Sequence, residues 1–584
     1  SPVMHAPARS LWLLLGLAGA IVAATLVARP LWPVDETRYV AVAWEMWQRG
    51  DFLVPYLNGA PYSHKPPLLF WLMQLGWALF GVNDWWPRMV APTFAVANLW
   101  LIAVLAKRLW PQQPQLAVLA PWLVFGSLLW LLFTPLTMFD MLVVFFTLIG
   151  MLGVARGWRS GGARGFVELG AALGFGILAK GPVILLHLLP VALAAPWWAL
   201  EPRPDWRRWY GGVALALGLG VLLALAWAVP AGLAGGAEYR DAIFWGQTAG
   251  RVKESFHHSF PWWWYLPLLP VVLFPWSLWL PVWRGLWRLR AAPRDAALRF
   301  CGAWLGLVFL LVSLVAGKQP HYLLPLFPAF VLLAAYALTA ADDTAREYDT
   351  VPVALGLGAV AGLWMYLVHD PQAFGMGAAE APSLRPGIVM AVCAFAVLFT
   401  TQLSLLRRVQ ALVAALLTVL VAGFVGAVDT VGPGFDLRPM AQRLKSLEEQ
   451  GRPVAYVGKY HGQFQFLGRL TQPLESVNDE AIVAWLAAHP NGYIVGSVYG
   501  TQYARVTNAL RTSTQVPLSP GLTTEFVQPY RRGGLYLARL DTATAGAIAR
   551  LGSAEAARRI RLPAADKPED TIARKAVVRW RTAD

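Results

Sequence analysis

The chain has few charged residues and almost no cysteine. Only 14% of its 584 residues are Asp, Glu, Lys or Arg, whereas 57% are hydrophobic, and there are two cysteines. A water-soluble protein of this length could not bury so much apolar surface, which excludes a soluble globular enzyme. Cys301 and Cys393 both lie in apolar runs, so we expect small core residues and not a disulfide or a metal pair.

Motifs that hold nucleotides are also missing where they would be expected. The polar C-terminal segment contains neither a P-loop nor a GxGxxG pattern, so it offers no nucleotide site. No internal repeat of the kind found in many transporters is evident. These absences disfavour a nucleotide-dependent enzyme and a duplicated transporter.

Long apolar runs are what the sequence does contain. The runs 11–28 and 351–368 carry no charge and approach the roughly 17–25 residues that cross a bilayer. They are continuous and do not alternate with polar residues, which predicts a polytopic α-helical membrane protein and not a β-barrel. We place thirteen spans, at 11–29, 88–106, 116–133, 140–155, 166–180, 182–200, 211–231, 263–283, 297–316, 322–340, 351–368, 387–405 and 410–428.

Basic residues are concentrated in alternate loops. They lie at 107–108, 156–164, 203–208, 284–294 and 407–408. The positive-inside rule makes these loops cytoplasmic, and it also explains the net charge of +15 without any nucleic-acid partner. The intervening loops therefore face outward: 30–87, 134–139, the turn near 180, 232–262, 317–321 and 369–386.

The composition changes after residue 428. The segments "RPVAYVGKY", "GYIVGSV" and "GGLYLARL" predict short β-strands, and "DEAIVAWLAAH" predicts a helix between them. We therefore expect a transmembrane domain at 1–428, followed by a small α/β domain at 429–584 outside the cytoplasm.

Two carboxylates mark the outer mouth of the first span. In "LWPVDETRYV", Asp35 and Glu36 directly follow the first apolar run. The ordinary interpretation is a helix start whose first-turn acids contact the helix dipole. The segments 36–50 and 65–81 are rich in tryptophan and predict helices that lie in the membrane interface.

Other ionisable residues share the outer face with these acids. They are Asp140 in "TPLTMFD", Lys180, Lys318 and the cations of "GRVKESFHH". Charged groups at membrane depth are costly and usually functional, and lysine and arginine neutralise phosphate well. The pattern favours a site for a phosphorylated headgroup above a lipid tail.

These elements together resemble a known family. The "DE-x-x-Y" start, "HKPPL", "TPLTMFD", "AKGP" and "GKQPHYLLP" occur in this order on one side of the membrane. The set is similar to the GT-C superfamily of membrane glycosyltransferases, which includes the protein O-mannosyltransferases, and most closely to the bacterial lipid A aminoarabinose transferases. The residues around Gln319 and His321 depart from the family's form, which leaves their roles open.

The resemblance implies transfer of 4-amino-4-deoxy-L-arabinose from an undecaprenyl-phosphate carrier to lipid A phosphate, and hence resistance to polymyxin and cationic peptides. It places the enzyme in the bacterial inner membrane with its active site on the periplasmic side. The alternatives are a protein O-mannosyltransferase, or another transferase that uses a polyprenyl-phosphate sugar, and a non-enzymatic transporter. A Ser or Thr acceptor would require Asp35 to remove a proton, whereas an ionised phosphate would not.

Candidate residues follow from this resemblance and from the outward-facing loops. The catalytic candidates are Asp35, Asp140 and Glu36, and the donor-phosphate candidates are Lys65, Arg251 and Lys318. The substrate-cavity candidates are Arg38, Tyr39, Tyr62, Lys180 and Tyr322. No cofactor is required, but His64, His257 and His258 could hold a divalent ion such as zinc, the alternative being surface histidines without a metal.

Overall fold

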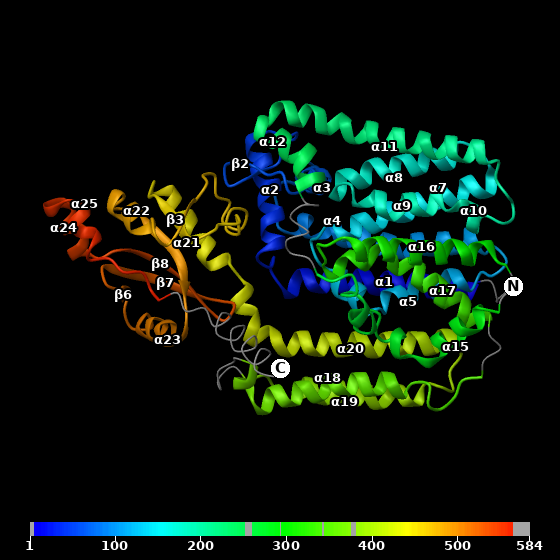
Figure 1. The fold of residues 1–584 in the computed structure, drawn as a ribbon. Coiled ribbons are helices and arrows are strands. Elements are labelled where there is room, and N and C mark those ends of the chain that lie inside the picture. Colours follow the sequence, from blue (N-terminus) through cyan, green and yellow to red (C-terminus); the bar gives the residue numbers. More distant parts are fainter. Residues whose placement is uncertain (1–4, 251–259, 292–293, 341–343, 375–380, 565–584) are drawn as a thin grey trace, which may run out of the picture.

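The computed structural model describes residues 5–250, 260–291, 294–340, 344–374 and 381–564 of the chain. A bundle of long helices runs through one part of the molecule, and a smaller α/β part lies at one end of it (Figure 1). Arg251, His257 and His258 lie outside the described residues.

Eight helical segments in the described ranges are long and apolar enough to cross a membrane, which confirms a multi-span membrane protein. They are or contain α1 (His5–Ala28), α4 (Trp85–Leu109), α7 (Asp140–Ser160), α11 (Trp206–Ala234), α16 (Ala296–Leu314), η4 with α17 (Pro320–Leu326 and Phe327–Ala340), α18 (Val351–His369) and α20 (Leu405–Val431).

The other five predicted spans are shorter or broken helices. They are α5 with α6 (Leu116–Phe125, Leu128–Phe133), α8 (Arg164–Lys180), α9 with α10 (Val183–Leu193, Ala195–Trp198), the run η2, α14, η3 and α15 (Leu266–Leu268, Leu269–Val272, Trp276–Leu278, Leu280–Leu289), and α19 with η7 (Arg385–Ala396, Val397–Phe399). Prolines at 270, 275 and 281 interrupt the fourth of these, because proline donates no hydrogen bond within a helix. The count of thirteen spans stays a prediction.

One end of the bundle, the end predicted to face outward, is covered by α2 (Asp35–Arg49), the short strands β1 (Tyr56–Leu57) and β2 (Ala60–Pro61), α3 (Leu68–Phe80) and α12 (Ala237–Asp241). The helices predicted at 36–50 and 65–81 are confirmed as α2 and α3. Both α2 and α12 lie at the end of the bundle that faces the α/β part (Figure 1).

The α/β part follows α20 through the short helix η8 (Gly432–Phe435). Its six-stranded sheet has the order β4-β3-β5-β8-β7-β6, parallel from β4 to β5 and antiparallel beyond. The elements are α21 (Arg438–Glu449), β3 (Val454–Val457), β4 (Glu475–Val477), α22 (Ile482–Ala488), β5 (Tyr493–Val498), α23 (Gly500–Ala509), β6 (Val516–Ser519), β7 (Leu522–Tyr530), β8 (Gly533–Leu540), α24 (Thr542–Leu551) and α25 (Ser553–Ala557). The three predicted strands and the predicted helix are confirmed as β3, β5, β8 and α22.

The α/β part is held to the outer helices by hydrogen bonds and ring contacts. The Trp44 indole donates to the Leu470 carbonyl at 3.0 Å. Asn58 exchanges two bonds of 2.7 and 2.9 Å with the backbone of Leu474. Phe466 stacks on Trp77 of α3 with ring centroids 5.4 Å apart. The loops predicted to face outward therefore share one end of the bundle with the sheet.

Candidate active site

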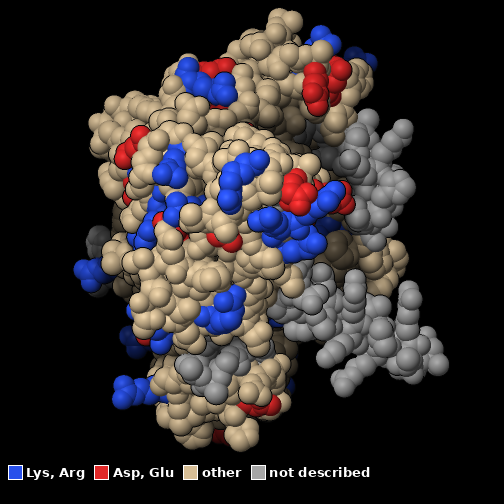
Figure 2. Space-filling view, turned by 90° about the vertical axis from the view of Figure 1, so that its left-hand side faces the viewer, with Lys and Arg blue, Asp and Glu red and all other residues tan. Residues whose placement is uncertain are grey.

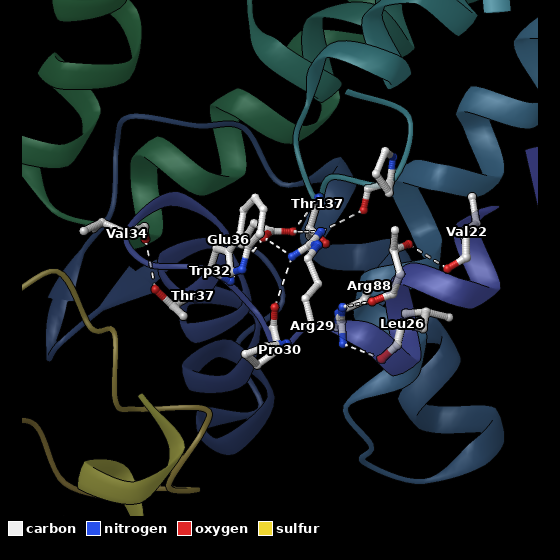
Figure 3. Close-up of polar contacts among 12 residues, drawn as sticks. Val22, Leu26, Arg29, Pro30, Trp32, Val34, Glu36, Thr37, Arg88 and Thr137 are labelled. Atoms are coloured by element: carbon white, nitrogen blue, oxygen red, sulfur yellow. Dashed lines mark hydrogen bonds and ion pairs between the residues drawn. The ribbon is translucent and has the colours of Figure 1, made fainter. Parts of the chain in front are cut away.

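The turn between α1 and α2 is fixed by Glu36. Its buried carboxylate accepts two bonds from the Arg29 guanidinium, at 2.6 and 3.1 Å. It also accepts the backbone N–H groups of Trp32 at 3.1 Å and of Thr137 at 2.9 Å (Figure 3). All these bonds point into the protein. Glu36 is a predicted catalytic residue, but these partners indicate a structural role for its carboxylate.

Two arginines complete this anchor. Arg29 also donates to the carbonyl of Pro135, at 3.0 Å. Arg88 of α4 donates to the carbonyls of Thr25 and Leu26, both at 3.1 Å, at the end of α1 (Figure 3). The anchor therefore joins the first outer loop to the loop that precedes α7, and it brings the segments that carry Asp35 and Asp140 together.

Asp35 faces away from this anchor. Its side chain is 55% exposed, and its carboxylate accepts a bond of 2.5 Å from Arg38. Val34 is the residue that caps α2, and no side-chain cap bond is formed. Asp35 is therefore a first-turn acid that remains accessible, whereas its neighbour Glu36 is enclosed.

Asp140 begins α7 and is buried. The Lys180 ammonium donates to its Oδ1 at 2.7 Å, and the His321 Nε2 lies 3.9 Å from its Oδ2. The same ammonium lies 4.5 Å from the ring centroid of Tyr322. Three segments far apart in the sequence thus meet at one carboxylate, as their common sidedness predicted.

Lys65 lies beside this group. Its ammonium is 5.3 Å from the ring centroid of Phe139, the residue before Asp140. Lys65 and Asp35 are both within electrostatic reach of His321. We refer to Asp35, Lys65, Asp140, Lys180 and His321 as the outer charged cluster. Asp35, Asp140 and Lys180 lie at helix ends, and Lys65 lies in the segment that leads into α3.

The tyrosine candidates line the same region. Tyr39 is buried with its ring edge against Phe139, at a centroid distance of 4.7 Å. Burial, helped by the Asp35 carboxylate, raises the pKa of the Tyr39 phenol above its ordinary value, so the phenol stays protonated and can donate a hydrogen bond. Tyr62 lies 5.4 Å from the His64 ring.

Lys318 has a different environment from the one predicted. Its buried ammonium donates to the carbonyls of Phe260 at 3.0 Å and Val315 at 2.7 Å. These bonds hold the turn after α16, from which the chain continues to His321. The Lys318 ammonium uses two of its three protons in these bonds, so Lys318 positions that turn.

A metal site at His64 stays a prediction, because its two proposed partner histidines lie outside the described residues. Among the residues that the structure does describe, no group of three His, Cys, Asp or Glu side chains could hold a metal ion.

Two polar groups of the site were missed from the sequence. Arg29 was counted as the end of a span, although it is the counter-ion of Glu36. His187 of α9 is buried within electrostatic reach of Lys180 and Asp140, and its Nδ1 has no hydrogen-bond partner in the described part of the chain. The sequence alone could have indicated His187, because a histidine inside an apolar span usually has a function.

Figure 2 shows the side of the molecule on which the α/β part lies, where lysine, arginine, aspartate and glutamate side chains stand on a surface that is otherwise mostly uncharged. The outer charged cluster, at one end of an apolar bundle, suits a reaction between two amphiphiles. Their tails would stay among the helices, while cations and carboxylates act on the headgroups.

The chain shares sequence with known protein families. Residues 64–232 match the profile of the family described as dolichyl-phosphate-mannose-protein mannosyltransferase. The chain is 34% identical over 376 residues to an undecaprenyl phosphate-alpha-4-amino-4-deoxy-L-arabinose arabinosyl transferase of Pseudomonas paraeruginosa, covering 62% of this chain and 67% of that relative. It is 32% identical over 353 residues to the protein of the same name from Edwardsiella ictaluri, covering 59% and 62%. The chain thus spans about two thirds or less of the length of these relatives.

The fold is similar to that of solved structures as well. The chain superposes on ArnT from Cupriavidus metallidurans, a crystal structure bound to undecaprenyl phosphate, with a TM-score of 0.66 and 21% identity, covering 91% of this chain and 98% of that one. This likeness confirms the GT-C type of fold predicted from the motifs. On the identity and coverage shared with the Pseudomonas paraeruginosa relative, the chain belongs to the family of undecaprenyl phosphate-alpha-4-amino-4-deoxy-L-arabinose arabinosyl transferases.

Proposed function

We propose that this glycosyltransferase moves 4-amino-4-deoxy-L-arabinose from an undecaprenyl-phosphate carrier to a phosphate of lipid A. The observation that supports it most is the outer charged cluster, where Lys65 and Lys180 lie with Asp35 and Asp140 at one end of an apolar helix bundle. Both substrates carry their charge at one end of a lipid, and a site at the membrane interface suits them.

The lysines would stabilise the leaving group. As the glycosidic bond breaks, the sugar becomes oxocarbenium-like and the carrier's phosphate takes the electron pair. Lys65 lies above the Phe139 ring, and we assign it to this developing charge. Arg251 and Lys318 remain proposed contributors, although the two carbonyls held by Lys318 leave it one proton for a ligand.

Asp35 would act on the sugar. A lipid A phosphate is already ionised near neutral pH and needs no general base, so the accessible carboxylate is free to face the cationic sugar or its amine. Arg38, bonded to Asp35 at 2.5 Å, holds the carboxylate at the start of α2. A protein O-mannosyltransferase would use the same carboxylate as a base.

Asp140 would orient Lys180 and His321. Replacing it by asparagine should lower turnover by roughly 10²-fold, because the lysine loses the partner 2.7 Å away. The control is Asp349→Asn. That residue forms a similar pair with Arg284 of α15, at 2.5 and 2.8 Å. Helix α15 lies near the end of the bundle opposite to the α/β part (Figure 1). Turnover per folded molecule, measured with purified protein, should fall in the first variant only. Equal losses in both would mean that Asp140 contributes stability alone.

The outer charged cluster and the segment 429–584 would face the periplasm, with 1–428 embedded in the inner membrane. Alkaline phosphatase fused after residue 440 should therefore be active, and the same fusion after residue 158 inactive. An inactive distal fusion in a stably expressed protein would contradict this orientation.

Mass spectrometry of lipid A tests the proposed function in cells. A strain without its own aminoarabinose transferase, but able to make the lipid-linked sugar, should gain aminoarabinose on lipid A and polymyxin resistance when it expresses this protein. Unmodified lipid A together with a new hexose on protein Ser or Thr residues would favour the O-mannosyltransferase instead.

A further inference from the structure

A cavity of about 570 Å³ lies in the α/β part where it meets the start of α2. This volume is within the range of small-ligand sites. Its wall is formed by Val34, by the loops that follow β3 and β5, and by the turn between β7 and β8. None of the residues considered so far as substrate contacts lines it, so it is a second site next to the outer charged cluster.

The sheet topology explains why a cavity forms here. The parallel strands β3 and β5 end at the same edge of the sheet, the usual position for ligands in such sheets. Gly458 follows β3 with a φ of 97°, which a residue with a side chain seldom adopts, so the chain can leave the strand sharply. The ends of two parallel strands therefore shape one side of the cavity, and the loops that leave the sheet there carry its exposed cations, Lys459, Arg531 and Arg532.

The turn between β7 and β8 is held in an uncommon conformation. Arg531 has a φ of 51°, a region that non-glycine residues rarely occupy. Its backbone N–H donates to the Gly434 carbonyl at 2.9 Å, which ties the turn to the segment that follows α20. This bond fixes the backbone from which Arg531 and Arg532 reach the cavity.

The lining is basic. Lys459, Arg531 and Arg532 contribute to it with His461, and Asp479 is the acid among the lining residues. Within the described part of the chain, no ion pair neutralises the three cations. Such an excess of positive charge suits a phosphate group.

The lining also suits a sugar. Four tyrosines, the Ser497 hydroxyl and the Gln463 amide share the wall with the cations, the tyrosines being Tyr456, Tyr499, Tyr530 and Tyr536. Tyrosine offers an apolar ring face and a polar hydroxyl in one side chain, which matches the two kinds of surface on a saccharide. Charge and tyrosines together indicate a phosphorylated sugar.

The cavity lies close enough to Asp35 for this carboxylate to act on His461, one of the lining residues. Val34, which lines it, directly precedes that residue. Burial, with the nearby cations of Arg38 and Lys459, lowers the pKa of His461, while Asp35 acts in the opposite sense. The Nε of Arg38 is a buried donor with no acceptor in the described part of the chain.

We propose that this cavity binds the phosphorylated sugar headgroup of the acceptor lipid. Lys459 and Arg532 hold phosphate, and the tyrosines face the sugar rings. The inference rests on the proposed function, since it assigns the acceptor to a place beside Asp35.

The test reverses the charge of two lining residues in the full-length protein. Lys459→Glu combined with Arg532→Glu should raise the apparent KM for lipid A by roughly tenfold or more, because a charged contact becomes repulsive. The apparent KM for the lipid-linked sugar, kcat at saturating lipid A and the unfolding midpoint should stay unchanged. Arg550→Glu, on the exposed face of α24, is the matched control and should leave every value unchanged.

Native mass spectrometry of the detergent-solubilised protein separates this inference from the proposed function. The wild type should retain bis-phosphorylated lipid A in preference to dephosphorylated lipid A and phosphatidylglycerol, and the double variant should lose this preference. Selective binding without transfer would overturn the proposed function alone. Transfer with an unchanged apparent KM in the double variant, or equal retention of phosphatidylglycerol, would overturn the inference.

Discussion

Asp35→Asn should lower transfer by roughly 10²–10³-fold while leaving the thermal unfolding midpoint nearly unchanged, as expected for a group that acts on charge in the transition state. The carboxylate is 55% exposed, and Arg38 is its one ion-pair partner in the described residues, so its loss removes little from the fold. Steady-state transfer with purified protein measures the first effect, and thermal unfolding in the same detergent measures the second.

A control variant separates the chemistry from the arginine contact. Arg38→Gln removes the partner of Asp35 but keeps the carboxylate, so it should lower activity less than Asp35→Asn does. If Asp35→Asn retained more than about a tenth of the activity, Asp35 would be a first-turn acid of α2 without a catalytic role.

Glu36→Gln should have the opposite profile, with a large loss of stability. It leaves the Arg29 guanidinium buried without its counter-ion, and breaking such a pair costs about 3–5 kcal/mol. Both side chains are almost fully enclosed, at 3% and 4% exposure, so water cannot replace the lost contact. Thermal unfolding of the purified variant should show a clearly lower midpoint than that of Asp35→Asn.

The double variant Arg29→Met with Glu36→Met provides the control for this second prediction. It removes both charges, so it should recover much of the stability that Glu36→Gln loses. A Glu36→Gln protein that unfolds like the wild type but transfers no sugar would instead place Glu36 in the chemistry.

The sequence predicted where charged groups gather more reliably than what each of them does. The long apolar runs and the arginine-bearing loops place Asp35, Asp140 and Lys180 on one face, and the structure joins the last two at 2.7 Å. Asp35 and Glu36 are adjacent, however, and successive helical residues point about 100° apart. Which of them is enclosed depends on the turn from Arg29 to Val34 and on the Thr137 amide, neither of which has a sequence signal.

The remaining differences have equally local causes. The broken helix around Pro275 reads as one apolar span, because hydropathy does not register the hydrogen bonds that proline removes. Strand β7, with the sequence "LTTEFVQPY", is largely polar and contains a proline, so it was not predicted. The cavity beside Val34 combines residues more than 400 positions apart, and no local pattern identifies such a contact.

The central claim is tested most directly by the reaction of purified, reconstituted protein with undecaprenyl-phosphate-linked aminoarabinose and lipid A. Mass spectrometry should show aminoarabinose on a lipid A phosphate together with released undecaprenyl phosphate, and Asp35→Asn should form both products at least about 10²-fold more slowly. Equal transfer to dephosphorylated lipid A or to a Ser/Thr peptide, or product formation that does not depend on Asp35, would contradict the account.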